Sequence, residues 1–92
     1  MRLSKKEIEI IKSVIYEIFY DAQIYLFGSR LDNKKGGDID LFIVPKDKAN
    51  LYEKKIKAIA KLENILNKPV DVIVHKDFKR GIEQEALKGE IL

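Results

Sequence analysis

Hydrophobic side chains near the start of the chain recur at intervals of three and four residues, as on one face of a helix. This spacing predicts a first helix over about residues 4–20. Ser4 and Glu7 have the spacing of a capping box, which supports a helix start at that point. The apolar positions of this face are Ile8, Ile11, Val14, Ile15, Ile18 and Phe19. The helix is therefore expected to bury one side against a core.

A second stretch with helical spacing occupies the middle of the chain. It starts after Asn50, which together with Glu53 repeats the capping-box spacing, and it ends where Asn67 and Pro69 break the helix. Its apolar positions are Tyr52, Ile56, Ile59, Leu62 and Leu66. A short last helix is predicted over about residues 80–88, before a glycine.

Three segments have the pattern of strands. Residues 24–27 are apolar and rich in β-branched and aromatic side chains, residues 38–44 alternate between two faces before Pro45, and residues 70–74 form an apolar run interrupted by one acid. The short link between the first two strands favours antiparallel pairing, while the helix between the second and third favours parallel pairing. The predicted fold is α+β, a small mixed sheet with helices packed on one side, in a single domain over residues 1–92.

Composition narrows the classes of protein to consider. The chain has 92 residues, 46% hydrophobic and 36% charged, and no apolar run has the roughly 20 residues of a membrane-spanning helix. The absence of cysteine excludes disulfides, thiolate zinc sites and cysteine nucleophiles. The N-terminus lacks a secretory pattern, so a cytoplasmic location is expected. A net charge of +3 is too small to indicate direct nucleic-acid binding by itself.

Acidic residues on the predicted strands are the main candidates for chemistry. Asp38 and Asp40 are two residues apart and therefore point to the same face, and Asp71 on the neighbouring parallel strand can join them. Three converging carboxylates repel one another unless one or two Mg²⁺ ions lie between them. Two alternatives stay open: a solvent-facing strand for the first two acids, and a salt bridge to Lys or Arg for Asp71.

The turn after the first strand is a candidate phosphate site. Gly28 allows a phosphate to approach the main chain, the Ser29 hydroxyl can hydrogen-bond it, and the planar guanidinium of Arg30 can bind its oxygens. A Gly-Ser turn is also common without any ligand. His75, the single histidine, is interpreted as structural or exposed rather than as a metal ligand.

Taken together, Gly28-Ser29, a spacer, Asp38-Ile39-Asp40-Leu41 and the later Asp71 resemble the signature of the DNA polymerase beta superfamily of nucleotidyltransferases, in particular its minimal members. The resemblance implies a mixed-sheet core, ATP as substrate, and Mg²⁺ bound by the three aspartates. It also implies that Asp71 orients or deprotonates the acceptor hydroxyl. Minimal nucleotidyltransferases often resemble antitoxins whose partner is a helical toxin of the HEPN class, which some of them inactivate by transferring AMP to a tyrosine.

The hypothesis is thus transfer of a nucleoside monophosphate, AMP from ATP, to a hydroxyl of a protein partner. One alternative is a non-catalytic antitoxin that neutralises its toxin by stoichiometric binding. Another is transfer to a small molecule, although 92 residues leave little room for an acceptor pocket. A basic nucleic-acid-binding module is the third. Eight residues separate Ser29 from Asp38, fewer than in many members of the family that this chain resembles.

Overall fold

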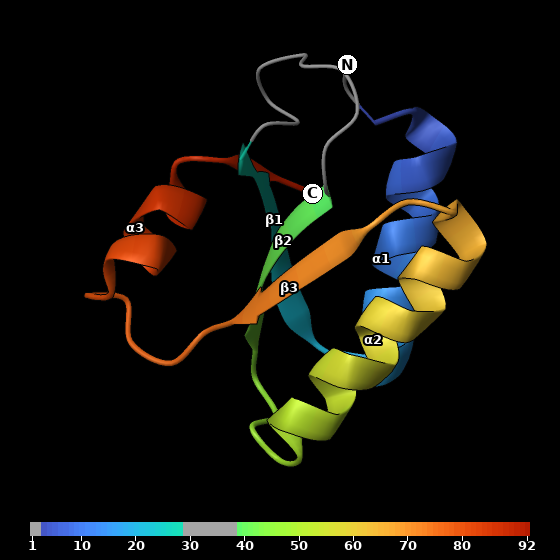
Figure 1. The fold of residues 1–92 in the computed structure, drawn as a ribbon. Helices are drawn as coiled ribbons and strands as arrows, with labels where there is room; N and C mark the ends of the chain where they lie inside the picture. Colours follow the sequence, from blue (N-terminus) through green and yellow to red (C-terminus); the bar gives the residue numbers. More distant parts are fainter. Residues whose placement is uncertain (1–2, 29–38) are drawn as a thin grey trace.

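The computed structural model describes residues 3–28 and 39–92, and these form three helices and four strands (Figure 1). The helices are α1 (Lys5–Phe19), α2 (Leu51–Leu66) and α3 (Gly81–Leu87). The strands are β1 (Ala22–Phe27), β2 (Ile39–Pro45), β3 (Val70–Val74) and β4 (Glu90–Ile91). The order of the helices and of the first three strands is the predicted one. Strand β4 was not predicted.

The four strands form one mixed sheet in the order β3-β2-β1-β4. Strand β1 is antiparallel to both of its neighbours, whereas β2 and β3 are parallel and are joined through α2. Both pairings expected from the lengths of the connections are confirmed. The two central strands carry most of the pairing, so residues at their ends are held by a continuous hydrogen-bonded ladder.

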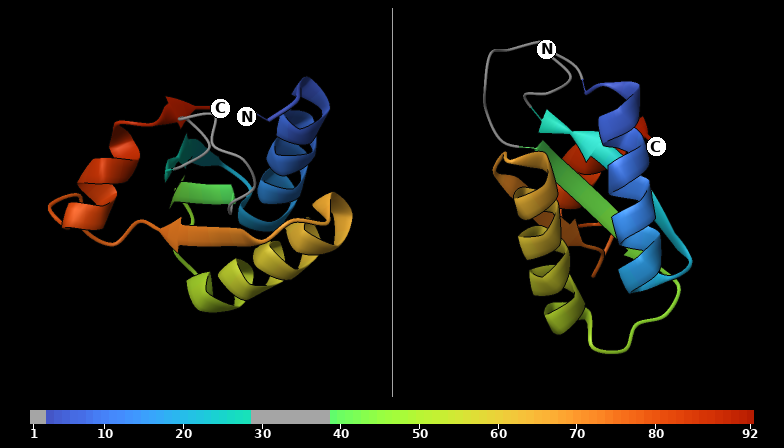
Figure 2. Two further views of the ribbon diagram at one scale, coloured as in Figure 1. Left: turned by 45° about the horizontal axis from the view of Figure 1, so that its top comes forward. Right: turned by 90° about the vertical axis from the view of Figure 1, so that its right-hand side faces the viewer.

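The helices cover the two faces of the sheet unequally. Helices α1 and α2 lie side by side on one face, and the short α3 lies on the other (Figure 2). The larger core lies under α1 and α2 and includes the fully buried Phe19, Leu41 and Leu62. A small cluster of Phe27, Phe42 and Ala86 lies under α3. The α+β class with a mixed sheet is confirmed, with the correction that one of the helices packs on the opposite side.

The ends of the helices follow the predictions in part. The capping box of α1 is present, because the Glu7 amide donates to Ser4 Oγ at 3.1 Å and the Ser4 amide donates to Glu7 Oε1 at 2.9 Å. The capping box expected at Asn50 is wrong: this residue has a left-handed backbone (φ 56°) and no side-chain cap. A side-chain cap needs an extended backbone at that position. Helix α2 ends at Leu66 with Asn67 as its C-cap, so the end predicted at Asn67 is confirmed.

Strand β3 forms one edge of the sheet, and side chains bind both ends of its outer side. The Val70 amide donates to Glu63 Oε2 at 2.9 Å, and Arg80 Nη2 donates to the Val74 carbonyl at 3.4 Å. Between them, Val72 has no exposed surface. Within the described ranges, no helix is long and apolar enough to cross a membrane.

Candidate functional site

Two of the predicted acidic residues face each other across neighbouring strands. Asp40 on β2 is the register partner of Asp71 on β3, in a parallel pairing whose strands lie about 4.8 Å apart. Because Ile39 and Leu41 point into the core under α1 and α2, the Asp40 side chain points to the α3 face. Asp71 is exposed and Asp40 is half-buried. The pair therefore lies at a surface that a ligand can reach.

The electrostatic setting of Asp71 suits a cation. In the part of the chain that the structure describes, Asp71 has no hydrogen bond or ion pair, so the alternative of a salt bridge to Lys or Arg finds no support there. Two carboxylates on adjacent strands repel each other unless a positive charge lies near them. Carboxylate oxygens are the ligands that Mg²⁺ prefers, so this donor set fits that ion.

The end of β1 brings a glycine against the Asp40 carboxylate. Phe27 is the register partner of Asp40, and Gly28 follows it with a φ of +81°, a left-handed conformation that side chains other than glycine rarely adopt. A Cβ atom built on Gly28 would collide with Asp40 Oδ2 and would lie 3.2 Å from Asp40 Cγ. The turn backbone and the carboxylate are thus in direct contact, and only glycine leaves room for both.

The remaining predicted site residues, Ser29, Arg30 and Asp38, lie outside the described residues. Their roles stay predictions. No three acidic or histidine side chains within residues 3–28 and 39–92 form a group that could hold a metal ion, so the described part contributes the pair Asp40 and Asp71.

A second polar cluster, centred on a buried carboxylate, lies beyond the other end of β3. Glu83 on α3 has no exposed surface and accepts hydrogen bonds from His75 Nδ1 at 2.7 Å, Arg80 Nε at 2.8 Å, and the amides of Lys76 and Asp77 at 2.8 and 3.0 Å. Burial alone would raise the pKa of Glu83, but these hydrogen bonds outweigh it and lower the pKa to about 2.

The Glu83 cluster fixes the segment between β3 and α3. It agrees with the structural interpretation of His75, whose ring it orients. Glu83 was not predicted from the sequence, although one signal existed: Glu83 lies three residues before Ala86, on the face of α3 that packs against the sheet.

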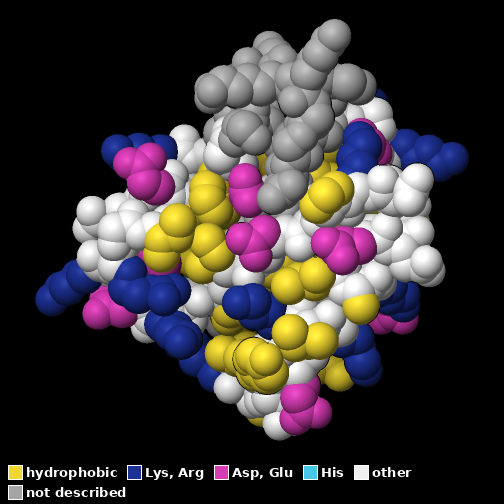
Figure 3. Space-filling view, viewed as in Figure 1, with side chains coloured by type: hydrophobic (Ala, Val, Ile, Leu, Met, Phe, Trp, Pro, Cys, Tyr) yellow, Lys and Arg dark blue, Asp and Glu magenta, His cyan; other side chains and the backbone are white. Residues whose placement is uncertain are grey.

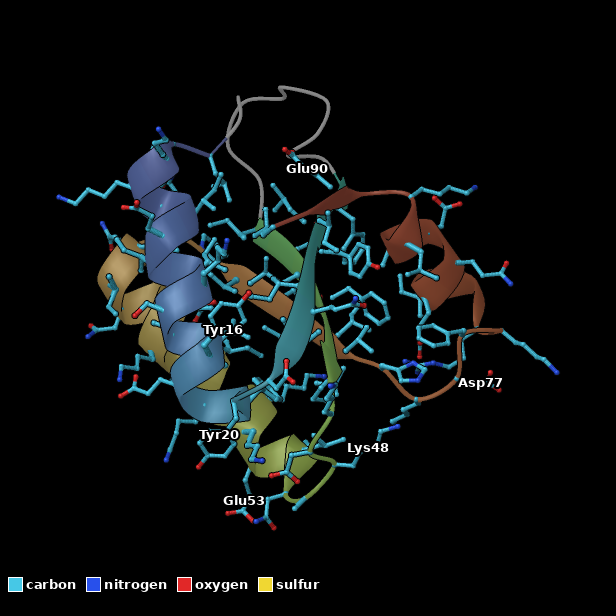
Figure 4. The ribbon with its side chains drawn as sticks, turned by 180° about the vertical axis from the view of Figure 1, so that it is seen from behind. Tyr16, Tyr20, Lys48, Glu53, Asp77 and Glu90 are labelled. Carbon is cyan, nitrogen blue, oxygen red and sulfur yellow. The ribbon has the colours of Figure 1, made fainter. Side chains whose placement is uncertain are left out.

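A hollow with a volume of about 840 Å³ lies elsewhere in the described residues, between α1 and α2. Tyr20 and Glu53, two of its lining residues, lie at the end of the molecule opposite Glu90 (Figure 4). Its lining carboxylate Glu17 is already paired with Lys61 at 2.7 Å. The candidate for metal chemistry is therefore the other end of the molecule, where Asp40 faces Asp71 across neighbouring strands.

Comparisons with known proteins identify the family and the fold of this chain. The family model described as polymerase beta nucleotidyltransferase matches residues 5–92. A mutant MntA–HpeT toxin–antitoxin structure has a TM-score of 0.77 at 24% identity, covering 99% of this chain and 72% of that one. The fold is shared with it.

Two further structures are more similar in sequence. A tri-AMPylated HEPN toxin in complex with an MNT antitoxin, from Shewanella oneidensis, has a chain with 25% identity and a TM-score of 0.66, covering 90% of this chain and 64% of that one. A toxin–antitoxin structure with AMP-PNP has 28% identity and a TM-score of 0.58, covering 74% and 56%. The search of curated proteins gave no significant match. With the family model covering nearly its whole length, this chain belongs to the polymerase beta family of nucleotidyltransferases.

Proposed function

We propose that this protein is a Mg²⁺-dependent nucleotidyltransferase that moves AMP from ATP to a hydroxyl of a protein partner, and that the partner is a HEPN-type toxin. The observation that carries the proposal is the facing pair Asp40 and Asp71, with the turn at Gly28 against Asp40. The similar structures support the nucleotide and the partner, because one contains an AMPylated HEPN toxin and another contains AMP-PNP.

In this proposal each residue has a separate task. Gly28 opens the main chain to the terminal phosphates, which Ser29 and Arg30 bind. Asp40 and Asp71, with Asp38, would hold Mg²⁺, which would neutralise the negative charge on the oxygens of the transferred phosphoryl group.

Asp71 is exposed and therefore accessible to the acceptor hydroxyl. Its carboxylate accepts the hydroxyl proton as the acceptor oxygen bonds to the α-phosphorus of ATP. The bond from that phosphorus to the bridging oxygen breaks, and pyrophosphate leaves with the electron pair.

The test is transfer of label from α-phosphate-labelled ATP to the co-purified partner in Mg²⁺. Asp40→Ala is expected to reduce labelling to background while the protein keeps or gains stability, because removal of one carboxylate relieves repulsion with Asp71. Asp21→Ala is the matched control, since Asp21 is an exposed carboxylate paired with Lys46 on the surface. Full labelling by Asp40→Ala would refute the proposed metal site.

A second candidate, stoichiometric neutralisation without catalysis, is favoured by the occurrence of the similar structures as toxin–antitoxin complexes. It predicts that Asp40→Ala still binds and neutralises the partner as well as the wild type does. Measuring toxin activity and label on the same samples separates the two candidates.

A further inference from the structure

Among residues 3–28 and 39–92, helix α3 leaves the face of β3 on its own side open. Helix α3 packs its buried Ala86 against Phe27 of β1 and Phe42 of β2, and its main contacts are with those two strands. On β3, by contrast, Asp71 is exposed and Ile73 is half-buried. Figure 3 shows acidic side chains in the middle of this side of the molecule, with hydrophobic side chains next to them.

An aromatic platform continues this open face. Positions 71, 73 and 75 alternate along the chain and point to the same side, so His75 lies about 13 Å from Asp71 at 3.3 Å per residue. Phe78 stacks on the His75 ring with 3.9 Å between ring centroids and 23° between planes, and it is 47% exposed. Glu83 bonds the His75 ring at 2.7 Å and so fixes the orientation of the ring on which Phe78 stacks.

Exposed lysines lie next to the platform, with one exposed carboxylate, Asp77, between them in the sequence. Lys76 and Lys79 are exposed, and neither side chain has an ion pair within the described ranges, whereas Arg80 is bound by Glu83. In Figure 3, Lys and Arg side chains gather at the lower left, over the segment that follows β3 in Figure 1. One end of the open face is therefore acidic and the other basic.

We propose that this open face of β3 binds an extended segment of the acceptor protein with a defined pattern: a hydroxyl residue at Asp71, an apolar residue about two positions later at Ile73, and acidic residues about four positions later at Lys76 and Lys79. This inference rests on the proposed function. The triphosphate lies at the Gly28 end, so the uncharged nucleoside offers nothing for these lysines to bind. An acidic polypeptide offers carboxylates that these lysines can bind.

The test uses two synthetic peptides. The first has a tyrosine, a leucine two positions after it, and glutamates at the fourth and fifth positions after it. The second peptide has lysines in place of the two glutamates. Binding is measured by fluorescence anisotropy in Mg²⁺ and AMP-PNP, and AMP transfer is measured with labelled ATP. The wild type is expected to prefer the acidic peptide about tenfold. The double variant Lys76→Glu/Lys79→Glu is expected to reverse that preference with no change in the KM for ATP.

The control is Lys57→Glu, a charge reversal of an exposed lysine in the hollow between α1 and α2, which is expected to leave the preference intact. Equal binding of both peptides by the wild type and the double variant overturns the inference. So does a raised KM for ATP in Phe78→Ala with unchanged peptide binding, which would make Phe78 a platform for the base. Selective binding of the acidic peptide without any AMP transfer supports the docking surface and refutes the proposed catalysis instead.

Discussion

Replacement of Gly28 by alanine is expected to damage both stability and transfer, because this residue combines a left-handed backbone with direct contact to a carboxylate. A φ of +81° costs an L-residue about 1–2 kcal/mol. The added methyl would also lie 3.2 Å from Asp40 Cγ, inside the 3.5–4.0 Å at which carbon atoms attract, and would overlap Asp40 Oδ2. The Asp40 carboxylate must therefore turn away.

The two effects have separate readouts. A loss of about 1–2 kcal/mol corresponds to a fall in Tm of roughly 5–15 °C for a domain of this size, measurable by thermal unfolding. A displacement of about 1 Å in a reacting group lowers rates about 100-fold, measurable as AMP transfer at a temperature where the variant stays folded. Gly81→Ala is the matched control, since a Cβ there has no atom within 4 Å.

Wild-type transfer by Gly28→Ala, with normal stability, would refute the reasoning that the turn and Asp40 act as one unit. Loss of stability with full transfer at low temperature would show that the position of Asp40 does not limit the reaction. Loss of transfer in Gly81→Ala as well would make the effect nonspecific.

Two further predictions concern the fold. Because the pKa of Glu83 is lowered from 4.5 to about 2, its ionised form contributes about 3 kcal/mol to the free energy of unfolding above pH 4.5, and this contribution is lost as the pH falls from 4.5 to 2. In urea titrations, the free energies of unfolding of the wild type and of Glu83→Gln should therefore converge over that pH range. A constant difference between the two proteins would contradict the assignment. Leu62→Ala, at a fully buried core position on α2, should lower the free energy of unfolding by about 2–5 kcal/mol in urea titrations, whereas Ile65→Ala, at a position 47% exposed on the same helix, should cost much less; equal costs would contradict the placement of the core.

Elements with strong periodicity were predictable from sequence. The apolar face of α1 and the alternation in β2 each depend on neighbours within one element, and the structure confirms both. The cap at Asn50 was wrong because a residue pattern does not report the backbone conformation, which is left-handed there. Strand β4 has two residues and forms through pairing with the distant β1, so no local sequence pattern predicted it.

The sequence predicts which face of the sheet the candidate site residues occupy, but it does not predict the register that pairs them. Strand alternation predicts that the Asp40 side chain points away from the core that contains Ile39 and Leu41, and the structure confirms this direction. The register of β3 against β2 places Asp71 directly across from Asp40. This register depends on where α2 brings the chain back to the sheet, and the packing of α2, not the composition of the strands, determines that position. Glu83 was missed because its role comes from four donors that only the fold brings together.

The side chains that bind the outer ends of β3 limit how this protein can meet other chains. An edge strand with free amides and carbonyls invites an additional strand, from a second copy or from an aggregate. Here Glu63 occupies the Val70 amide, Arg80 occupies the Val74 carbonyl, and Val72 between them is covered. A partner therefore cannot extend the sheet at β3. It must approach Asp71 over the face of the sheet, so side chains rather than main-chain pairing select it, and the edge strand beside the carboxylates does not promote self-assembly.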